Sequence, residues 1–177
     1  MPQAVLALLL CVGVCARALA GPCVKQVFGR YCLGGTLEQQ LRLAPKPAFR
    51  QDDDDHQGLV YRQSGEWIYV LAYKGQIYKV VKRYRPGTQH TFSELERELV
   101  TKYGPFEEHN RFPAYASREG LQIAAIRRGE GWVLHRWRPP DTPWRVELSW
   151  TRDMDVALAY LMNDLDAQQR AAREDGL

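Results

Sequence analysis

Hydrophobic and polar residues follow two periods along this chain, one typical of helices and one typical of strands. The helical period is clearest over four hydrophobic residues, Phe92, Leu95, Leu99 and Tyr103. Thr91 precedes them and Glu94 follows three residues later, which is the pattern of a capping box at a helix start. Gly104-Pro105 is a helix-terminating pair. The spacing therefore predicts a helix from Thr91 to Tyr103.

A shorter helix is predicted from Leu37 to Ala44. Thr36 and Gln39 form a second capping-box pattern in front of it, and Leu37 and Leu41 share one helical face. Pro45 ends the predicted helix because proline cannot donate the backbone hydrogen bond that would continue it.

Runs of β-branched and aromatic residues predict strands over 59–63, 66–73 and 76–84, separated by turns at Ser64-Gly65 and Lys74-Gly75. Further strands are predicted over 121–127, 131–137 and 145–150. Residues 154–162 fit both a strand and a helix; we favour a strand, with a short polar helix over 165–174 that is weakly tied to the body.

The order of these elements predicts an α+β fold, in which an antiparallel sheet is packed by two short helices. A helix followed by aromatic strands occurs twice along the chain. This order predicts a tandem helix-plus-strands repeat that shares one sheet, although the two halves have few residues in common.

Three segments carry a family resemblance: Leu33-Gly34-Gly35-Thr36, Tyr73-Lys74-Gly75-Gln76-Ile77-Tyr78 and Lys102-Tyr103-Gly104-Pro105. Over residues 33–162 the pattern of elements resembles small exported bacterial proteins of the β-lactamase-inhibitor-protein-like architecture, which also includes small outer-membrane assembly proteins. The resemblance implies a non-enzymatic protein that holds another macromolecule with its sheet or loops. It assigns no catalytic residue.

The first twenty residues read as a removable export signal. An apolar run from Ala4 to Ala16 ends near Ala18-Leu19-Ala20, a small-x-small cleavage pattern. The run is shorter than the roughly 20 apolar residues that span a bilayer, so we expect no membrane span. We predict a periplasmic or secreted protein with a signal peptide over 1–20, a disulfide-tethered segment over 21–35, an α+β domain over 36–163 and a polar helix or tail over 164–177.

Cysteine use agrees with an oxidising compartment. Cys11 and Cys15 belong to the predicted signal, which leaves Cys23 and Cys32 as an isolated pair. We predict a disulfide between them rather than a metal or redox site, because no further ligands stand nearby.

Charge excludes one broad class of partner. The formal net charge is +3, and the loss of Arg17 with the predicted signal leaves 23 basic against 21 acidic residues. Nucleic-acid binding usually requires a clear basic excess, so no nucleic-acid partner is predicted. The sequence does not indicate an oligomeric state.

The turn at Lys74-Gly75 predicts the pairing of its hairpin, with Leu71 opposite Tyr78, Tyr69 opposite Val80 and Trp67 opposite Lys82. One face would then carry aromatic residues, and the other an aliphatic set with Lys79 and Arg83. We predict that the aliphatic face is core and that the aromatic face binds a protein partner. The predicted partner-binding residues are Trp67, Tyr69, Tyr73, Tyr78, Lys82 and Arg62. The reverse assignment, with the aromatic face buried, stays open.

Candidates for chemistry are few. Four consecutive aspartates, Asp52 to Asp55, precede His56, but consecutive carboxylates repel one another and lack the spacing of a calcium loop, so no metal is predicted. The four histidines are scattered and no nucleophile or phosphate-binding motif occurs, so no catalytic residue or cofactor is predicted. The favoured function is an exported, non-catalytic protein-binding module, either an inhibitor or an envelope-assembly accessory. The alternative is a small envelope hydrolase around His109, with Glu107 or Glu108.

Overall fold

The computed structural model describes residues 23–44 and 46–175, so the predicted signal peptide lies outside the described residues. The fold is built on one antiparallel sheet of eight strands in the order β3-β4-β5-β6-β10-β9-β8-β7. The strands are β3 (Phe49–Asp53), β4 (His56–Gln63), β5 (Glu66–Tyr73), β6 (Gln76–Tyr84), β7 (Glu107–Glu108), β8 (Val133–Trp137), β9 (Trp144–Thr151) and β10 (Asp155–Met162). A separate hairpin joins β1 (Lys25–Val27) to β2 (Tyr31–Leu33).

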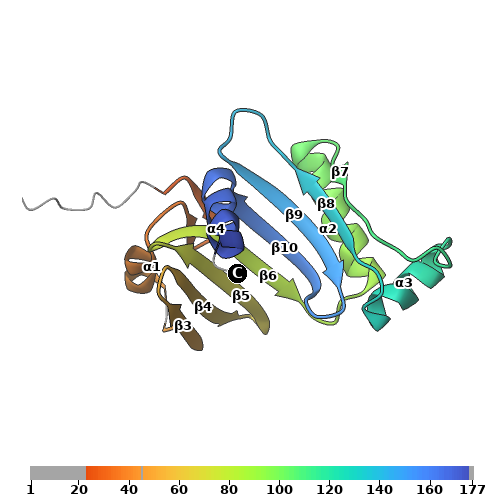
Figure 1. Cartoon of the computed structure of the whole chain (residues 1–177), viewed down its shortest axis with the longest axis horizontal. Helices are drawn as coiled ribbons and strands as arrows, with labels where there is room; N and C mark the ends of the chain where they lie inside the picture. The colour runs from red at the N-terminus through yellow and green to blue at the C-terminus, as the bar shows by residue number, and fades with distance from the viewer. Residues whose placement is uncertain (1–22, 45, 176–177) are drawn as a thin grey trace, which may run out of the picture.

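The sheet consists of two four-stranded halves that meet where β6 pairs with β10 (Figure 1). Helix α1 (Leu37–Leu43) precedes the four strands of the first half, and α2 (Gln89–Tyr103) precedes those of the second. The predicted α+β class is confirmed, and helix-then-strands order occurs in both halves. The second half is also interrupted by α3 (Glu119–Arg128) and followed by α4 (Asn163–Asp175).

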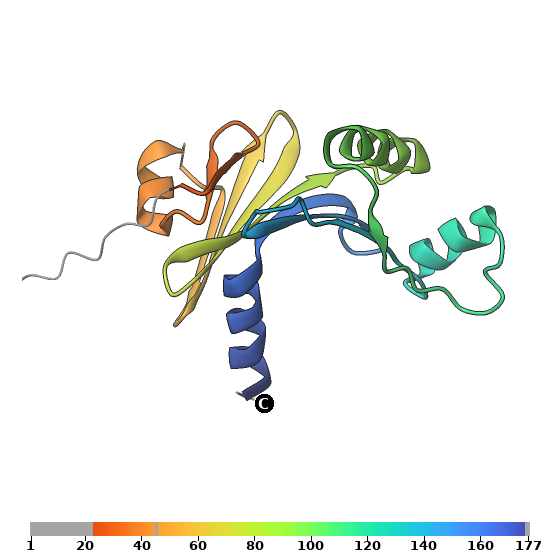
Figure 2. The same ribbon diagram turned by 90° about the horizontal axis from the view of Figure 1, so that it is seen from above.

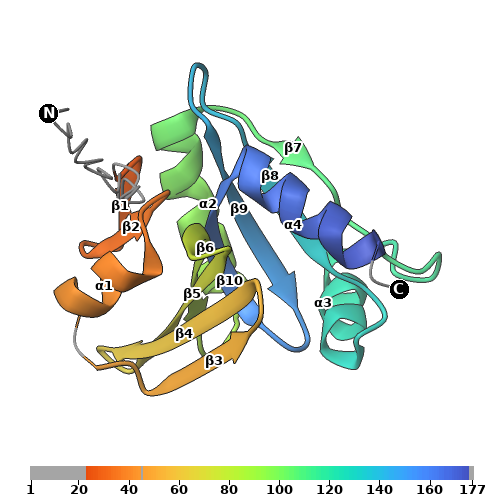
Figure 3. The same cartoon turned by 60° about the vertical axis from the view of Figure 1, so that its left-hand side comes forward.

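The main core lies on one side of the sheet, beneath α1, α2 and the β1–β2 hairpin (Figure 2). It includes the predicted aliphatic residues Ile68, Val70, Ala72 and Ile77, together with Leu37 and Phe92 from the two helices. We call the opposite side of the sheet the open face. Helix α4 projects from that side (Figures 2 and 3).

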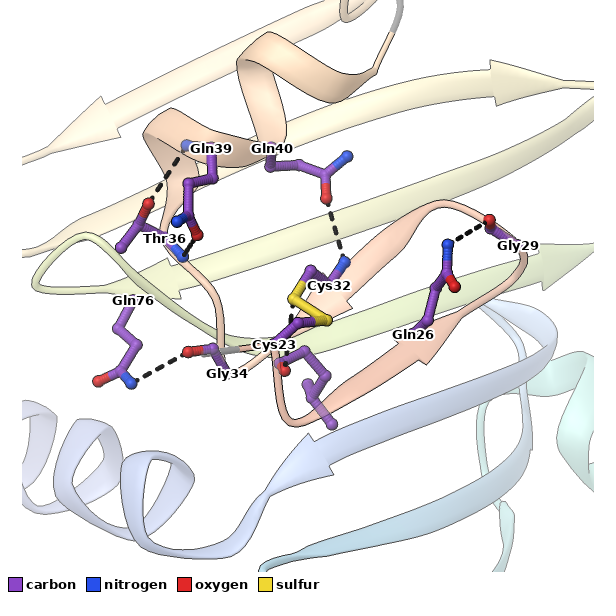
Figure 4. Close-up of a disulfide and its surroundings, with 10 residues drawn as sticks. Cys23, Gln26, Gly29, Cys32, Gly34, Thr36, Gln39, Gln40 and Gln76 are labelled. Atoms are coloured by element: carbon purple, nitrogen blue, oxygen red, sulfur yellow. Dashed lines mark hydrogen bonds between the residues drawn. A yellow bond between two sulfur atoms is a disulfide. The ribbon is translucent and has the colours of Figure 1, made fainter. Parts of the chain in front are cut away.

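The disulfide between Cys23 and Cys32 is confirmed, with the two Cα atoms 5.4 Å apart (Figure 4). The segment that it closes is part of the core, because Val27 and Tyr31 are buried. The backbone N–H of Cys32 donates to Oε1 of Gln40 at 3.1 Å, which ties β2 to α1 (Figure 4). The capping box of Thr36 and Gln39 is present as predicted.

Residues 121–127 are helical, so the predicted strand there is wrong. The segment lies in α3, which has Glu119 in its first turn and Arg127 and Arg128 in its last turn. An acidic residue at the start and basic residues at the end of a helix are stabilised by its dipole. Gly129 then adopts a left-handed conformation with φ 79°, which ends the helix.

The other boundaries are close to the predictions. Helix α2 starts earlier than expected, because Thr88 rather than Thr91 is the cap and accepts a hydrogen bond from the Thr91 N–H at 3.1 Å. Residues 155–162 form a strand, and a helix follows from Asn163, as favoured.

The predicted register of the β5–β6 hairpin is wrong beyond its turn. Tyr73 pairs with Gln76 and Ala72 with Ile77, but Leu71 then pairs with Lys79. Tyr78 is therefore the extra residue of a β-bulge, which shifts every later pair by one position. Tyr69 faces Val81 and Trp67 faces Arg83 instead of Val80 and Lys82.

Candidate functional site

Three side chains of β5 line the open face: Trp67, Tyr69 and Leu71. Each is half-buried, and each alternates with a fully buried residue on the core side. The guanidinium carbon of exposed Arg62, on the paired strand β4, lies 5.7 Å from the centroid of the Trp67 ring. Trp67, Tyr69 and Arg62 therefore lie together as predicted.

Tyr73 and Tyr78 lie on the same side but are only 5% and 6% exposed. Tyr73 packs on His56, whose Nε2 lies 3.5 Å from the Gln169 amide of α4. Tyr78 lines a pocket with Ala172 and Arg173 of the same helix, and burial raises its pKa. These two predicted contact residues are largely inaccessible to a partner.

Lys82 lies on the core side, because the bulge reverses the direction of the β6 side chains. It pairs with Ile68 and Leu158, and its ammonium lies 4.9 Å from the centroid of the Tyr84 ring. The prediction that Lys82 flanks Trp67 on one face is wrong. Arg83 takes that place, opposite Trp67.

The open face is basic around β5 and close to neutral over the whole sheet. On β4, β5 and β6, strand alternation places three basic residues there, Arg62, Lys79 and Arg83, and no acidic one. Arg83 pairs with Asp155 of β10, with Nη2 and Oδ2 2.7 Å apart. On the other strands the face carries Arg136 and Arg145 against Asp53, Glu107, Glu147 and Asp155. The electropositive part of the face is therefore the area around Trp67 and Tyr69.

An ion-pair network on the open face joins two strands to α4. Nε of Arg145 lies 2.8 Å from Glu147 Oε1, and Nε of Arg136 lies 3.0 Å from the same oxygen. Burial acts to raise the pKa of Glu147, but the Arg145 guanidinium outweighs it and the pKa is lowered. Arg145 also pairs with Asp166 of α4, which connects the helix to the sheet.

A second concave site lies on the core side, between α2, α3 and the β7–β8–β9 end of the sheet. It is a pocket of about 480 Å³. Its apolar lining includes Phe92, Phe112, Ile123, Ile126, Val133 and Trp150. Its polar lining includes Gln89, Ser93, Glu96, Glu108, Asn110, Glu119, Gln122 and His135.

His135 is the most buried titratable residue of this pocket, at 5% exposure. Its Nδ1 atom lies 2.8 Å from Glu96 Oε2, and its Nε2 atom lies 3.6 Å from Glu108 Oε1. The ring stacks on Phe106 with centroids 4.0 Å apart. Burial lowers the pKa of His135, and the two carboxylates oppose that shift without overcoming it.

The residues of the alternative hydrolase site are separated by strand alternation. His109 and Glu107 meet at 3.3 Å on the open side, where His109 also lies 3.3 Å from Arg136, whereas Glu108 turns to the pocket beside His135. His109 is exposed, and a hydrolase built on it stays a prediction. Sequence reasoning missed His135, although its position between Val133 and Trp137 places all three on one strand face.

The four aspartates Asp52 to Asp55 lie at the end of the β3–β4 hairpin, and their carboxylates do not gather around one point. Asp52 pairs with Arg50, with Nε and Oδ2 2.6 Å apart, and Asp55 lies 3.9 Å from the Lys74 ammonium. Within residues 23–44 and 46–175, no group of three or more His, Cys, Asp or Glu side chains has the arrangement of a metal site.

Among the described residues, none of the helices has the length and apolar character needed to cross a membrane. No family model and no curated protein matches the sequence. One similar solved structure is that of a cysteine-rich secretory protein from Staphylococcus aureus, at 10% identity and a TM-score of 0.45. The match covers 82% of this chain and 49% of that protein, so the chain spans about half the length of that structure.

Proposed function

We propose that this protein is an exported, non-catalytic binding module that docks an acidic protein surface on its open face. The contact is centred on Trp67 and Tyr69, with Arg62 and Arg83 beside them. The single observation that carries the proposal is this half-buried aromatic cluster on the basic part of the open face, away from the main core.

The composition of the cluster suits such a role. Trp, Tyr and Arg dominate the energetics of protein interfaces, because large rings bury much area and guanidinium groups pair with carboxylates. The three basic residues that β4, β5 and β6 place on this face, with no acidic one among them, favour an acidic partner and fast association with it. The Cys23–Cys32 disulfide supports export, since such bonds form and persist in oxidising compartments.

The test is capture of partners from an envelope extract of the source organism by the immobilised protein. We expect wild type to retain an acidic protein, and retention to fall as salt rises, because charge attraction between exposed groups is screened. Trp67→Ala should weaken retention about thirtyfold, the effect of losing a hot-spot residue of about 2 kcal/mol.

Trp132→Ala is the matched control, because Trp132 is also accessible, at 36% exposure, but stands beside β8, four strands from β5. It should retain the same partner as wild type. The proposal fails if Trp67→Ala and Trp132→Ala retain the partner equally. It also fails if Trp67→Ala lowers thermal stability enough to explain the loss, since the ring would then serve the fold.

A further inference from the structure

We propose that the pocket between α2, α3 and β8 binds an organic cation: an ammonium or guanidinium group carried on an apolar stem. This site is separate from the proposed docking surface, because the pocket lies on the core side of the sheet, around His135, and not on the open face. Its test therefore succeeds or fails independently of the docking proposal.

The charges of the pocket all have one sign. Glu96, Glu108 and Glu119 line it, and its lining contains no lysine or arginine. Glu119 accepts a hydrogen bond from the Gln89 amide, which links α3 to α2. An anionic ligand would face these carboxylates without a basic partner, whereas a cation would be attracted by all three.

The donors and acceptors around His135 leave one acceptor unmatched. A neutral imidazole has one N–H and one lone pair, but a carboxylate stands beside each ring nitrogen, Glu96 at 2.8 Å and Glu108 at 3.6 Å. One carboxylate must therefore face a lone pair. The buried Nδ1 atom makes no well-aligned hydrogen bond to Glu96 or to any other described residue.

A ligand with several N–H donors would provide hydrogen bonds to the unmatched acceptors around His135. An ammonium group has three donors and a guanidinium has five, enough to serve the imidazole lone pair and both carboxylates together. Asn110 cannot serve all three acceptors, because an amide has only two N–H donors and one of them already serves Glu108.

The remaining lining selects the stem of the ligand. Ile123, Ile126 and Val133 provide an aliphatic wall, and Phe92 and Trp150 stack on each other with centroids 6.0 Å apart. Aromatic faces attract cations as well as apolar groups. A volume of about 480 Å³ is in the range of small-ligand sites and larger than one alkyl amine needs.

The probes are hexylamine, 1-hexanol and hexanoate, titrated into the disulfide-bonded protein by calorimetry at pH 7.5 and low salt. The three share one stem and differ in charge. We expect saturable binding of hexylamine only. A blocked Gly-Lys-Gly peptide distinguishes the source of the cation: binding as tight as that of hexylamine indicates a protein side chain, and weaker binding indicates a free amine.

Location is tested by Glu96→Gln and Glu108→Gln, each of which should weaken hexylamine binding by about tenfold or more. Glu94→Gln is the matched control, because Glu94 lies on α2 but outside this pocket, paired with His90, and it should change affinity less than about twofold. The Trp150 indole N–H signal, assigned through Trp150→Phe, should shift on binding while that of Trp67 does not.

Three results would overturn the proposal: absence of saturable binding of both hexylamine and the lysine peptide, equal binding of 1-hexanol, or affinity unchanged in both glutamine variants. If Glu96→Gln does not fold, Glu108→Gln decides alone, since Glu108 is an exposed residue whose side chain is 64% accessible.

Discussion

The pKa of the His135 side chain depends strongly on the residues that surround it. The ring is buried among Phe92, Phe106 and Trp137, and this burial lowers its pKa despite the neighbouring Glu96 and Glu108. In an unfolded chain the same imidazole has a pKa of about 6.5. The unfolded state therefore binds a proton at a higher pH than the folded state does.

This difference predicts a pH dependence of stability. Above about pH 6.5 the imidazole is neutral in both states, and its contribution to the free energy of unfolding is fully present. As the pH falls below that value, proton uptake favours the unfolded chain. The free energy of unfolding of wild type minus that of His135→Asn should thus decrease from pH 7.5 to pH 5.5, as measured by urea titration. A difference that is flat or rises on acidification would show that the two carboxylates outweigh burial.

Helix α4 is held more firmly than its polar sequence indicates. Asp166 and Gln169 are buried, and Asp166 pairs with Arg145 of β9 and with Arg170 one turn along the helix. The carboxylate keeps a pKa below its ordinary value, because the two guanidinium groups outweigh the opposing effect of burial. One pair of charges thus joins this helix to the sheet.

Asp166→Asn should lower the free energy of unfolding by about 3 kcal/mol, because it leaves the Arg145 cation buried without one of its partners. Urea titration measures the loss, and hydrogen exchange should show faster opening of α4. Asp164→Asn is the control, since Asp164 occupies the same first turn but is exposed. Equal effects of the two substitutions would mean that the helix dipole, and not the ion pair, holds α4.

Local patterns of hydrophobic and polar residues predicted most of the helices and strands. They failed where one pattern is compatible with two conformations. Leu121, Ile123 and Ala125 alternate as in a strand, but Glu119 and Gly129 are the start and stop signals of a helix. The bulge at Tyr78 left no such signal. An inserted residue keeps the local composition of a strand and changes only which neighbour it faces, so the positions of Lys82 and Arg83 were not predictable from the hairpin turn.

At the scale of the whole molecule, the β1–β2 hairpin covers the junction of the two halves. Strand β2 contacts both β6 and β10, and Phe28 packs edge-on against Tyr160, with centroids 5.6 Å apart. The Lys25 ammonium lies 4.2 Å from the centroid of the Trp144 ring of β9. The isolated cysteine pair and the predicted export signal predicted the disulfide, but not this bridging position or the His135 pocket, because both depend on contacts between distant segments.

Replacing both Cys23 and Cys32 by serine should lower the free energy of unfolding of the whole protein by about 2 to 3 kcal/mol, the value expected for a short closed loop. Urea unfolding monitored by fluorescence should remain a single transition, since the hairpin contacts both halves. If only the hairpin unfolds and the unfolding transition of the sheet is unchanged, the two halves of the sheet do not depend on the disulfide-bonded hairpin for stability.

The pairing of β6 with β10 also sets an order of events during synthesis. Residues 79–84 bond to residues 156–161, so β6 lacks its neighbour on that side until the ribosome has made residue 161. An unpaired strand of this length is a template for pairing with other chains. A truncated product that stops before Asp155 would therefore self-associate, and a chaperone that shields β6 while the chain is incomplete would raise the yield of the folded protein.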